Sequence, residues 1–330
     1  MSDAFGTVAS GTGGVWRVLR DDGAELEAVL RGRLKKGDTG RRADGSMRRD
    51  TVATSAQTVK LAVGDRVRLA QDASEAWTIE EVLPRSSRLA RRAPGGGRGE
   101  RVIAANLDQA IIMFAAAKPE PHPRMLDRFL VIAEANALAP LIIINKIELV
   151  GEAAARATFA DYERAGYPVH FISVKQQIGL EPVRDSLARR VSVVSGPSGV
   201  GKSSLLNALF PGLGLRVSEI SESVNKGRHT TVGAFLHPLV QGLGATAGAI
   251  VDTPGLREIG LWELAPRELD QCFPELRMAR EGCRFADCAH GAEPGCAVRA
   301  AVEAGTLSAS RYDSYLRLRA EVEEQELQRY

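Results

Sequence analysis

The 330-residue chain lacks the segments that carry proteins into or across membranes. Residues 1–14 have neither a basic start nor an apolar stretch, so they do not resemble a secretory signal peptide. The longest apolar run, residues 138–144, is too short to cross a bilayer. We therefore expect a cytoplasmic protein with no membrane partner.

Cysteine, net charge and repetition are also scarce. The chain has four cysteines, a formal net charge of +2 and no internal repeat. Hydrophobic residues make up 44 % and charged residues 25 %, which is typical of a globular protein rather than a disordered or fibrous one. A chain of 330 residues exceeds what one hydrophobic core usually organises, so we expect two or three domains. We also expect the protein to be a monomer.

Positive charge is nevertheless concentrated in the first third of the chain. Between residues 31 and 49, eight basic side chains accompany only two acids, and between residues 85 and 101 six arginines accompany only one. Such clusters suit contact with a phosphate backbone. Solvated loops balanced by acids elsewhere would carry the same pattern, and charge alone does not decide between the two.

Short strand-like segments separated by turns fill the first hundred residues. The candidates are residues 6–10, 15–19, 27–30, 58–61, 65–69 and 77–82. Several short strands over this length suit a small β-barrel of the OB-fold type. Residues 94–97, Pro-Gly-Gly-Gly, are typical of a linker, so we place an OB-fold domain that binds RNA at residues 1–98.

From residue 102 the chain alternates between buried-strand and helical patterns. The strand candidates are residues 110–115, 141–144, 169–172, 191–194 and 249–251. The helix candidates are residues 123–136, 153–165, 180–189 and 202–210. This alternation predicts a parallel sheet covered on both faces, in an α/β domain at residues 99–260. A helical domain follows at residues 261–330, and its tail carries Tyr312, Tyr315, Leu316 and Val322 at helical spacing.

A phosphate-binding loop is the clearest motif. Residues 196–203 follow a strand candidate, open a helix candidate and fit the pattern G-x-x-x-x-G-K-[ST]. Backbone N–H groups of such a loop wrap phosphates, helped by the positive end of the helix. We assign nucleotide binding to Gly196, Pro197, Ser198, Gly199, Val200, Gly201, Lys202, Ser203 and Ser204. Lys202 should reach the β- and γ-phosphates, and Ser203 should ligate Mg²⁺.

Three further motifs each follow a strand candidate, where ligands of parallel sheets bind. The first, Asp252-Thr-Pro-Gly255, suits a water-mediated Mg²⁺ contact by Asp252 and γ-phosphate sensing by the Gly255 N–H. The others resemble the guanine-reading N-K-x-D motif and the loop whose backbone contacts the guanine oxygen. They comprise Asn145, Lys146 and Glu148, and Ser173, Val174 and Lys175. Together the motifs predict GTP and GDP as ligands.

One position departs from the guanine-reading pattern. Glu148 replaces the usual Asp, which keeps the negative charge but lengthens the side chain by one methylene. A carboxylate there accepts hydrogen bonds from the N1–H and 2-amino group of guanine, neither of which adenine offers. We expect guanine preference to survive with somewhat weaker affinity.

The C-terminal third carries a candidate metal site. Cys283, Cys288, His290 and Cys296 lie within fourteen residues and supply three thiolates and an imidazole. That set completes a tetrahedral Zn²⁺ shell without an open position, which predicts one structural zinc ion rather than a catalytic one. Chance clustering or redox thiols are the alternative. Cys272 lies outside the spacing and is read as a small apolar residue.

The motifs stand in an unusual order, with the guanine-reading segments before the phosphate loop. Circular permutation gives this order and leaves the site intact. Together with Gly64-Asp65-Arg66-Val67, Asn106-Leu-Asp108, residues 227–231 and the cysteine cluster, it closely resembles the circularly permuted, small-ribosomal-subunit-dependent GTPases (RsgA/YjeQ). The resemblance implies an OB domain, a permuted GTPase domain and a zinc domain. It also implies GTP hydrolysis late in maturation of the small ribosomal subunit, stimulated by that subunit and its rRNA.

The residue that orients the attacking water is less evident. Many GTPases place Gln after D-x-x-G, but this chain has Leu256. His229 is the nearest candidate, and the resemblance supports a catalytic role; a loop histidine that contacts the partner is the alternative. Thr230 or Thr231 should complete the Mg²⁺ shell with Ser203, and Thr231 is our candidate.

The sequence leaves two other functions open. Because Leu256 cannot orient water, the chain could be an RNA-binding assembly factor for which GTP is only a ligand. A nucleotide kinase shares the phosphate loop, but the Asp252 and Asn145 motifs argue against it. Since the second γ-phosphate sensor, residues 252–255, runs almost directly into the domain at residues 261–330, we also hypothesise that hydrolysis reorients residues 283–330.

Overall fold

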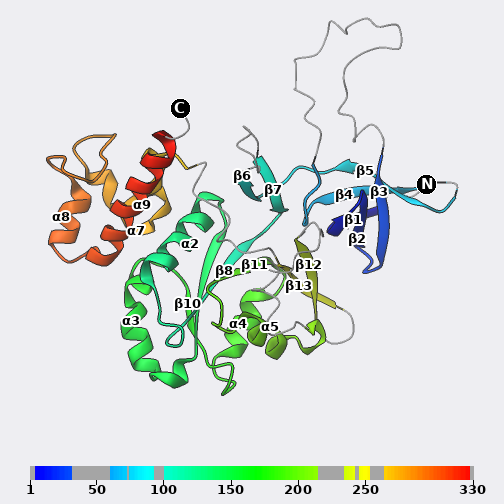
Figure 1. Cartoon of the computed structure of the whole chain (residues 1–330), viewed down its shortest axis with the longest axis horizontal. Coiled ribbons are helices and arrows are strands. Elements are labelled where there is room, and N and C mark those ends of the chain that lie inside the picture. The colour runs from blue at the N-terminus through cyan, green and yellow to red at the C-terminus, as the bar shows by residue number, and fades with distance from the viewer. Residues whose placement is uncertain are drawn as a thin grey trace, which may run out of the picture.

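The computed structural model describes residues 4–31, 60–72, 74–92, 100–214, 234–241, 245–252 and 264–327. Along the chain these form a closed barrel, a two-stranded sheet, a six-stranded sheet flanked by helices, and a C-terminal group of helices. The barrel and the C-terminal helices lie at opposite ends of the long axis, with the large sheet between them (Figure 1). Within the described ranges, no helix combines the length and apolar character needed to cross a membrane.

Five strands close the N-terminal barrel in the order β1-β2-β3-β5-β4, which confirms the OB-type barrel. They are β1 (Ala4–Thr12), β2 (Val15–Arg20), β3 (Glu25–Leu30), β4 (Arg66–Gln71) and β5 (Trp77–Val82). The alternation is plain in β4, where Val67 and Leu69 are fully buried while Arg66 and Arg68 are not. The strand predicted at residues 58–61 is wrong for residues 60 and 61, and residues 58 and 59 lie outside the described ranges.

A two-stranded antiparallel sheet joins the barrel to the rest of the molecule, and we did not predict it. It consists of β6 (Arg88–Arg92) and β7 (Glu100–Ala105). Leu89 pairs with Ala104, and both are fully buried. The linker predicted at residues 94–97 lies outside the described residues, and the boundary placed after residue 98 falls between these two strands.

The central sheet has the strand order β10-β9-β8-β11-β13-β12. Its strands are β8 (Gln109–Ala115), β9 (Ala139–Asn145), β10 (Val169–Phe171), β11 (Val191–Ser195), β12 (Phe235–Gln241) and β13 (Ala245–Asp252). All neighbours are parallel except β12, which pairs antiparallel with β13 at the edge. The five predicted strands are therefore confirmed, and β12 was missed.

Helices cover both faces of this sheet, as expected. They are α2 (Pro123–Ala135), α3 (Glu152–Arg164), α4 (Leu180–Leu187) and α5 (Lys202–Leu209), with short turns η1 (Ile147–Leu149) and η2 (Pro211–Leu213). Alternate residues of β8 face opposite sides: Ile112 and Phe114 pack with the α2 and α3 side, and Ile111 and Met113 with the α4 and α5 side. Helix α4 ends two residues earlier than predicted because Ala188 adopts an extended backbone with ψ 129°.

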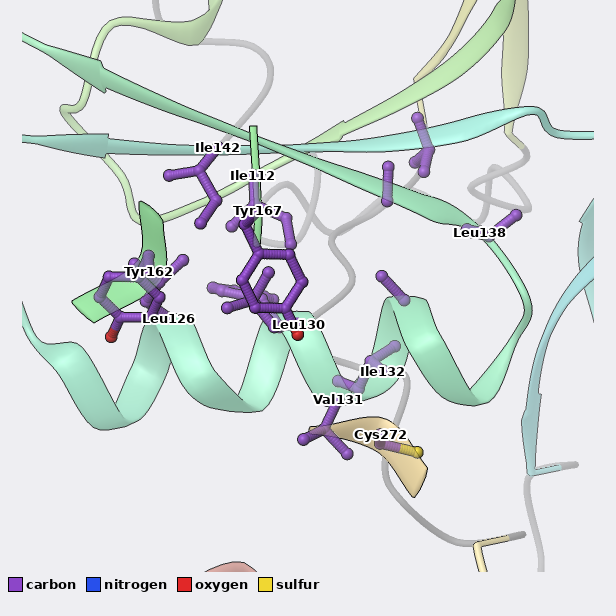
Figure 2. Packing of buried hydrophobic residues seen from close by; sticks show 14 of the residues in the cluster. Ile112, Leu126, Leu130, Val131, Ile132, Leu138, Ile142, Tyr162, Tyr167 and Cys272 are labelled. Carbon is purple, nitrogen blue, oxygen red and sulfur yellow. The ribbon is translucent and has the colours of Figure 1, made fainter. Parts of the chain in front are cut away.

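The C-terminal helices dock on α2 rather than forming a separate core. They are η4 (Pro266–Cys272), α7 (Pro274–Ala279), η5 (Arg280–Gly282), α8 (Ala297–Glu303) and α9 (Ala309–Leu327). Leu126 and Leu130 of α2 point toward Ile112 and Ile142 of the sheet, whereas Val131 points toward Cys272 of η4 (Figure 2). One continuous cluster of buried side chains thus runs from the sheet through α2 into the C-terminal region.

Candidate nucleotide and metal sites

The phosphate-loop candidate lies between β11 and α5, as predicted, and its shape depends on glycine. Gly196 has φ +142°, and a Cβ there would stand 2.0 Å from the Met113 carbonyl oxygen. Gly201, at the N-cap of α5, has φ +99°. The Lys202 ammonium group donates to the carbonyls of Gly196 at 3.0 Å and Pro197 at 2.8 Å. The loop therefore wraps around the Lys202 ammonium group, which binds two of the loop's carbonyl oxygens.

The predicted guanine-reading segment meets this loop directly. The Asn145 side chain donates from Nδ2 to the Val200 carbonyl at 2.8 Å, and its Oδ1 accepts from the Val174 N–H at 3.1 Å. A Cβ on Gly201 would stand 2.6 Å from Asn145 Nδ2, so this approach also requires glycine. One buried amide thus joins three segments that lie far apart in the sequence.

Lys146 provides a second connection to the phosphate loop. It has φ +63°, and its ammonium group donates to the Gly199 carbonyl at 2.7 Å and to the Lys118 carbonyl. Sequence reasoning missed Lys118, because a backbone carbonyl has no signature in side-chain chemistry. The left-handed turn at Lys146 then directs the chain into η1, which carries Glu148.

Glu148 presents an acceptor that the protein does not satisfy. Among the described residues, its Oε2 is buried and has no hydrogen-bond partner. Buried polar atoms in folded proteins are nearly always paired, so this carboxylate oxygen has room for a hydrogen bond from a donor. The N1–H and 2-amino group of guanine are donors of that kind. Ser173 is fully buried and caps its own loop by accepting from the Gln176 N–H, while Lys175 is exposed.

The γ-phosphate side of the site is only partly described. Ser203 is buried at the start of α5, and Asp252 ends β13, the neighbour of β11. The other predicted residues here are His229, Thr230, Thr231 and Gly255, which lie outside the described ranges. Their roles in Mg²⁺ binding, γ-phosphate sensing and water attack stay predictions.

The metal-site candidate is assembled as the spacing predicts. One ligand atom from each of Cys283, Cys288, His290 and Cys296 lies within 4.8 Å of all the others. His290 Nδ1 is 3.6 Å from the Cys283 sulfur and 3.5 Å from the Cys296 sulfur. Tetrahedral Zn²⁺ with bonds of ~2.3 Å to sulfur and ~2.0 Å to nitrogen places these atoms about 3.5 Å apart. The residues therefore fit a closed zinc shell.

The thiols differ in how readily they lose a proton. Burial raises the pKa of the Cys288 thiol to about 12. Burial also opposes ionisation of Cys283, but N–H groups of Val298 and Ala297 hold its pKa below the ordinary value. A metal must displace these protons to bind the thiolates, so its affinity for the cluster should rise with pH.

The segments Gly64-Asp65-Arg66-Val67 and Asn106-Leu-Asp108 connect the barrel to the sheet. Asn106 donates from Nδ2 to the Gly64 carbonyl at 2.9 Å and accepts from the Ser86 N–H at 2.9 Å. Gly64 has φ +87°, and a Cβ there would stand 2.1 Å from the Ala105 carbonyl oxygen. The Asp108 carboxylate accepts from the Val191 N–H at 2.7 Å, which joins β8 to β11. These segments are structural.

One arginine of the basic clusters is also structural. Arg85 donates from Nε and Nη2 to the carboxylate of Asp65 at 2.6 and 2.8 Å, and from Nη2 to the Lys60 carbonyl. Asp65 is fully buried. Arg85 therefore neutralises a buried acid beside β4, a role that the charge pattern alone did not reveal. Most of the 31–49 cluster lies outside the described residues.

Comparisons with known proteins agree with this arrangement. The sequence profile of the RsgA GTPase family matches residues 82–262. The chain is 56 % identical to the small ribosomal subunit biogenesis GTPase RsgA of Gemmatimonas aurantiaca, over 96 % of this chain and 97 % of that protein. It is 36 % identical to the protein of the same name from Bacteroides fragilis, over 97 % of each chain.

Two solved structures share the whole architecture. YjeQ from Thermotoga maritima superposes with a TM-score of 0.76 at 32 % identity, covering 97 % of this chain and 99 % of that one. YloQ, described as a circularly permuted GTPase, gives a TM-score of 0.71 at 28 % identity and covers 98 % of this chain and 96 % of that one. The order of the motifs, the barrel, the cysteine cluster and these likenesses agree: the chain belongs to the RsgA GTPase family.

Proposed function

We propose that this chain hydrolyses GTP to GDP and phosphate during biogenesis of the small ribosomal subunit, late in its maturation, and that the subunit stimulates the reaction. The observation that carries the GTP assignment is the Asn145 amide, which joins the phosphate loop to the loop at Val174. A nucleotide whose phosphates bind the phosphate loop would place its base beside the loop at Val174. The relatives' names supply the ribosomal part of the proposal.

The chain's own groups would divide the work of holding GTP. Loop N–H groups and Lys202 would bind the β- and γ-phosphates, and Ser203 would bind Mg²⁺ together with Thr231 and, through water, Asp252. Mg²⁺ would neutralise charge that develops on the phosphates. The N–H of Gly255 would sense the γ-phosphate. Residues 196–204, with Ser173, Val174 and the exposed Lys175, would make up the rest of the nucleotide site.

Base choice falls to Glu148, whose buried Oε2 has no partner among the described residues. The test is displacement of a fluorescent GDP analogue by GTP and by ATP. The wild type should prefer GTP strongly, Glu148→Asp should bind at least as tightly, and Glu148→Gln should lose most of the preference. Glu152→Gln, an exposed acid at the start of α3, is the matched control. Equal displacement by ATP and GTP would sink the guanine assignment.

Hydrolysis is tested separately from binding. Phosphate release should rise when purified small subunits are titrated in, and His229→Ala should lose that stimulation while it still binds GTP. Full stimulated turnover in the His229→Ala variant would contradict the water-positioning role. If subunits bind but release no extra phosphate, the chain is instead an RNA-binding factor for which GTP is a ligand.

The two flanking parts are proposed to grip the subunit. The barrel would contact ribosomal RNA, since OB-folds bind oligonucleotides and its neighbourhood is rich in arginine. The Cys283 to Cys296 cluster would bind one Zn²⁺, a structural ion that organises the C-terminal helices. Metal analysis of the purified protein should give one zinc per chain.

A further inference from the structure

His290 uses only one of its two ring nitrogens at the metal-site candidate. Its Nδ1 faces the sulfurs of Cys283 and Cys296 at 3.6 and 3.5 Å. Its Nε2 points away from the cluster and lies 3.2 Å from Oδ2 of Asp270. A neutral imidazole that binds a metal through Nδ1 must carry its proton on Nε2. The Asp270 carboxylate is therefore placed to accept that proton's hydrogen bond.

Residues outside the cysteine cluster hold Asp270 in this position. It lies in η4, twenty residues before His290 in the sequence, and only 4 % of it is exposed. Arg280 binds the same carboxylate, with Nε 3.2 Å from Oδ2 and Nη1 3.4 Å from Oδ1. Arg280 itself stands three residues before Cys283. A buried carboxylate is costly unless it is paired, and here a guanidinium and an imidazole N–H pair with it.

Two tyrosines of α9 hold the same loop from the opposite direction. The Tyr312 hydroxyl donates to the His290 carbonyl, and the Tyr315 hydroxyl donates to the Ala289 carbonyl at 2.9 Å. The Tyr315 ring also lies against the imidazole, with centroids 5.9 Å apart. These contacts fix the backbone and one face of the ring, but the tyrosine hydroxyls bind backbone carbonyls and not the ring nitrogens. Among the described residues, the Asp270 carboxylate is the group that contacts Nε2.

We propose that Asp270 is the positioning residue of the zinc site: it selects the His290 tautomer that directs Nδ1 at the metal and raises the affinity of the cluster for Zn²⁺. Outer partners of this kind typically account for a 10- to 100-fold difference in metal affinity. This inference rests on the proposed zinc site. It also gives η4 a function, because the same hydrogen bond connects the metal loop to an element packed on α2.

The experiment measures zinc affinity of the full-length chain by competition with a chromophoric chelator. Asp270→Ala removes the acceptor and should weaken binding by roughly 100-fold, while Asp270→Asn keeps an oxygen acceptor without the charge and should weaken it by roughly 10-fold. Asp287→Asn is the matched control: it removes an exposed acid from within the cluster, between Cys283 and Cys288, and should change affinity less than about threefold.

The proposal can also be tested on the wild-type protein alone. With zinc bound, ¹⁵N NMR of the histidine rings should show His290 protonated on Nε2 and metal-bound through Nδ1. An unprotonated Nε2 overturns the proposal, as does equal zinc affinity of Asp270→Ala and the wild type, or an equal loss in Asp287→Asn. A wild-type protein that binds no zinc contradicts the metal site itself, so the two failures are distinguishable.

Discussion

A buried arginine helps to anchor the C-terminal helices to α2. Arg311 of α9 donates to Asp127 of α2 at 2.6 Å and to Glu275 of α7 at 2.7 and 3.2 Å. Side-chain exposure is 2 % for Arg311 and 1 % for Asp127. Its guanidinium also lies 4.7 Å from the ring centroid of Phe273. Arg311→Met removes the charge, keeps most of the volume, and leaves the Asp127 carboxylate buried without its partner.

The expected cost follows from that stranded carboxylate. Removing one member of a buried ion pair typically costs ~3–5 kcal/mol. Since 1.4 kcal/mol is a tenfold change in an equilibrium constant, opening of α9 should become roughly 10²- to 4×10³-fold more frequent. Burial dominates at Asp127 and raises its pKa despite Arg311, so losing the cation should destabilise the ionised form further.

Hydrogen exchange followed by mass spectrometry reads this opening directly in the amides of α9. Arg317→Met is the matched control on the same helix, because Arg317 and its partner Asp313 are 58 % and 47 % exposed. Such a surface pair contributes about 0–1 kcal/mol. Adding Asp127→Asn to Arg311→Met should recover much of the loss, since it removes the stranded charge. If Arg311→Met accelerates exchange no more than Arg317→Met, the anchoring role is refuted.

Three further predictions concern other contacts. Gly201→Ala should weaken GDP binding at least 100-fold in a fluorescent-analogue titration, because its Cβ would stand 2.6 Å from Asn145 Nδ2 at φ +99°; tight binding would show that the loop tolerates the change. Asn106→Ala strands the buried Gly64 carbonyl and should destabilise the barrel by about 1–3 kcal/mol in denaturant unfolding followed by tryptophan fluorescence. An unchanged midpoint would contradict that role. Zinc removal by a chelator should speed exchange in residues 283–296 and the start of α9 but leave the barrel unchanged; equal acceleration in both would argue against a local effect.

Local motifs predicted the parts of the site whose chemistry is contained in a few adjacent residues. The phosphate loop, the Asn145 segment and the cysteine cluster each lie where the sequence places them, because each follows or contains a short, regular pattern. The sheet strands were recognisable for the same reason, as continuous apolar runs buried on both faces. Motifs and strands that are defined by a few adjacent residues were therefore predicted.

Features that depend on residues far apart in the sequence were not predicted. Strand β12 contains Pro238, which argues against a strand within a sequence window, but β12 is an edge strand, where proline is tolerated. Arg85 was counted as free positive charge because its partner, Asp65, lies twenty residues upstream. Asp270 lies outside the spacing of the metal ligands and, like the Lys118 carbonyl, becomes visible only once the chain is folded.

The contacts of the C-terminal region with α2 also determine how that region can respond to the nucleotide. By sequence, that region follows the γ-phosphate sensors, which suggests that hydrolysis reorients it. Its contacts, however, anchor it through Arg311 and Asp127 to α2. The segment preceding α2 carries the Lys118 carbonyl that binds Lys146, on the base side of the site. None of these residues is among the predicted γ-phosphate sensors. A reorientation must therefore carry α2 with it or break the buried pair. A ligand shifts such an equilibrium only by its differential affinity for the two arrangements. If the proposed ribosomal partner contacts both ends of the molecule, its binding can supply that energy as well as the nucleotide.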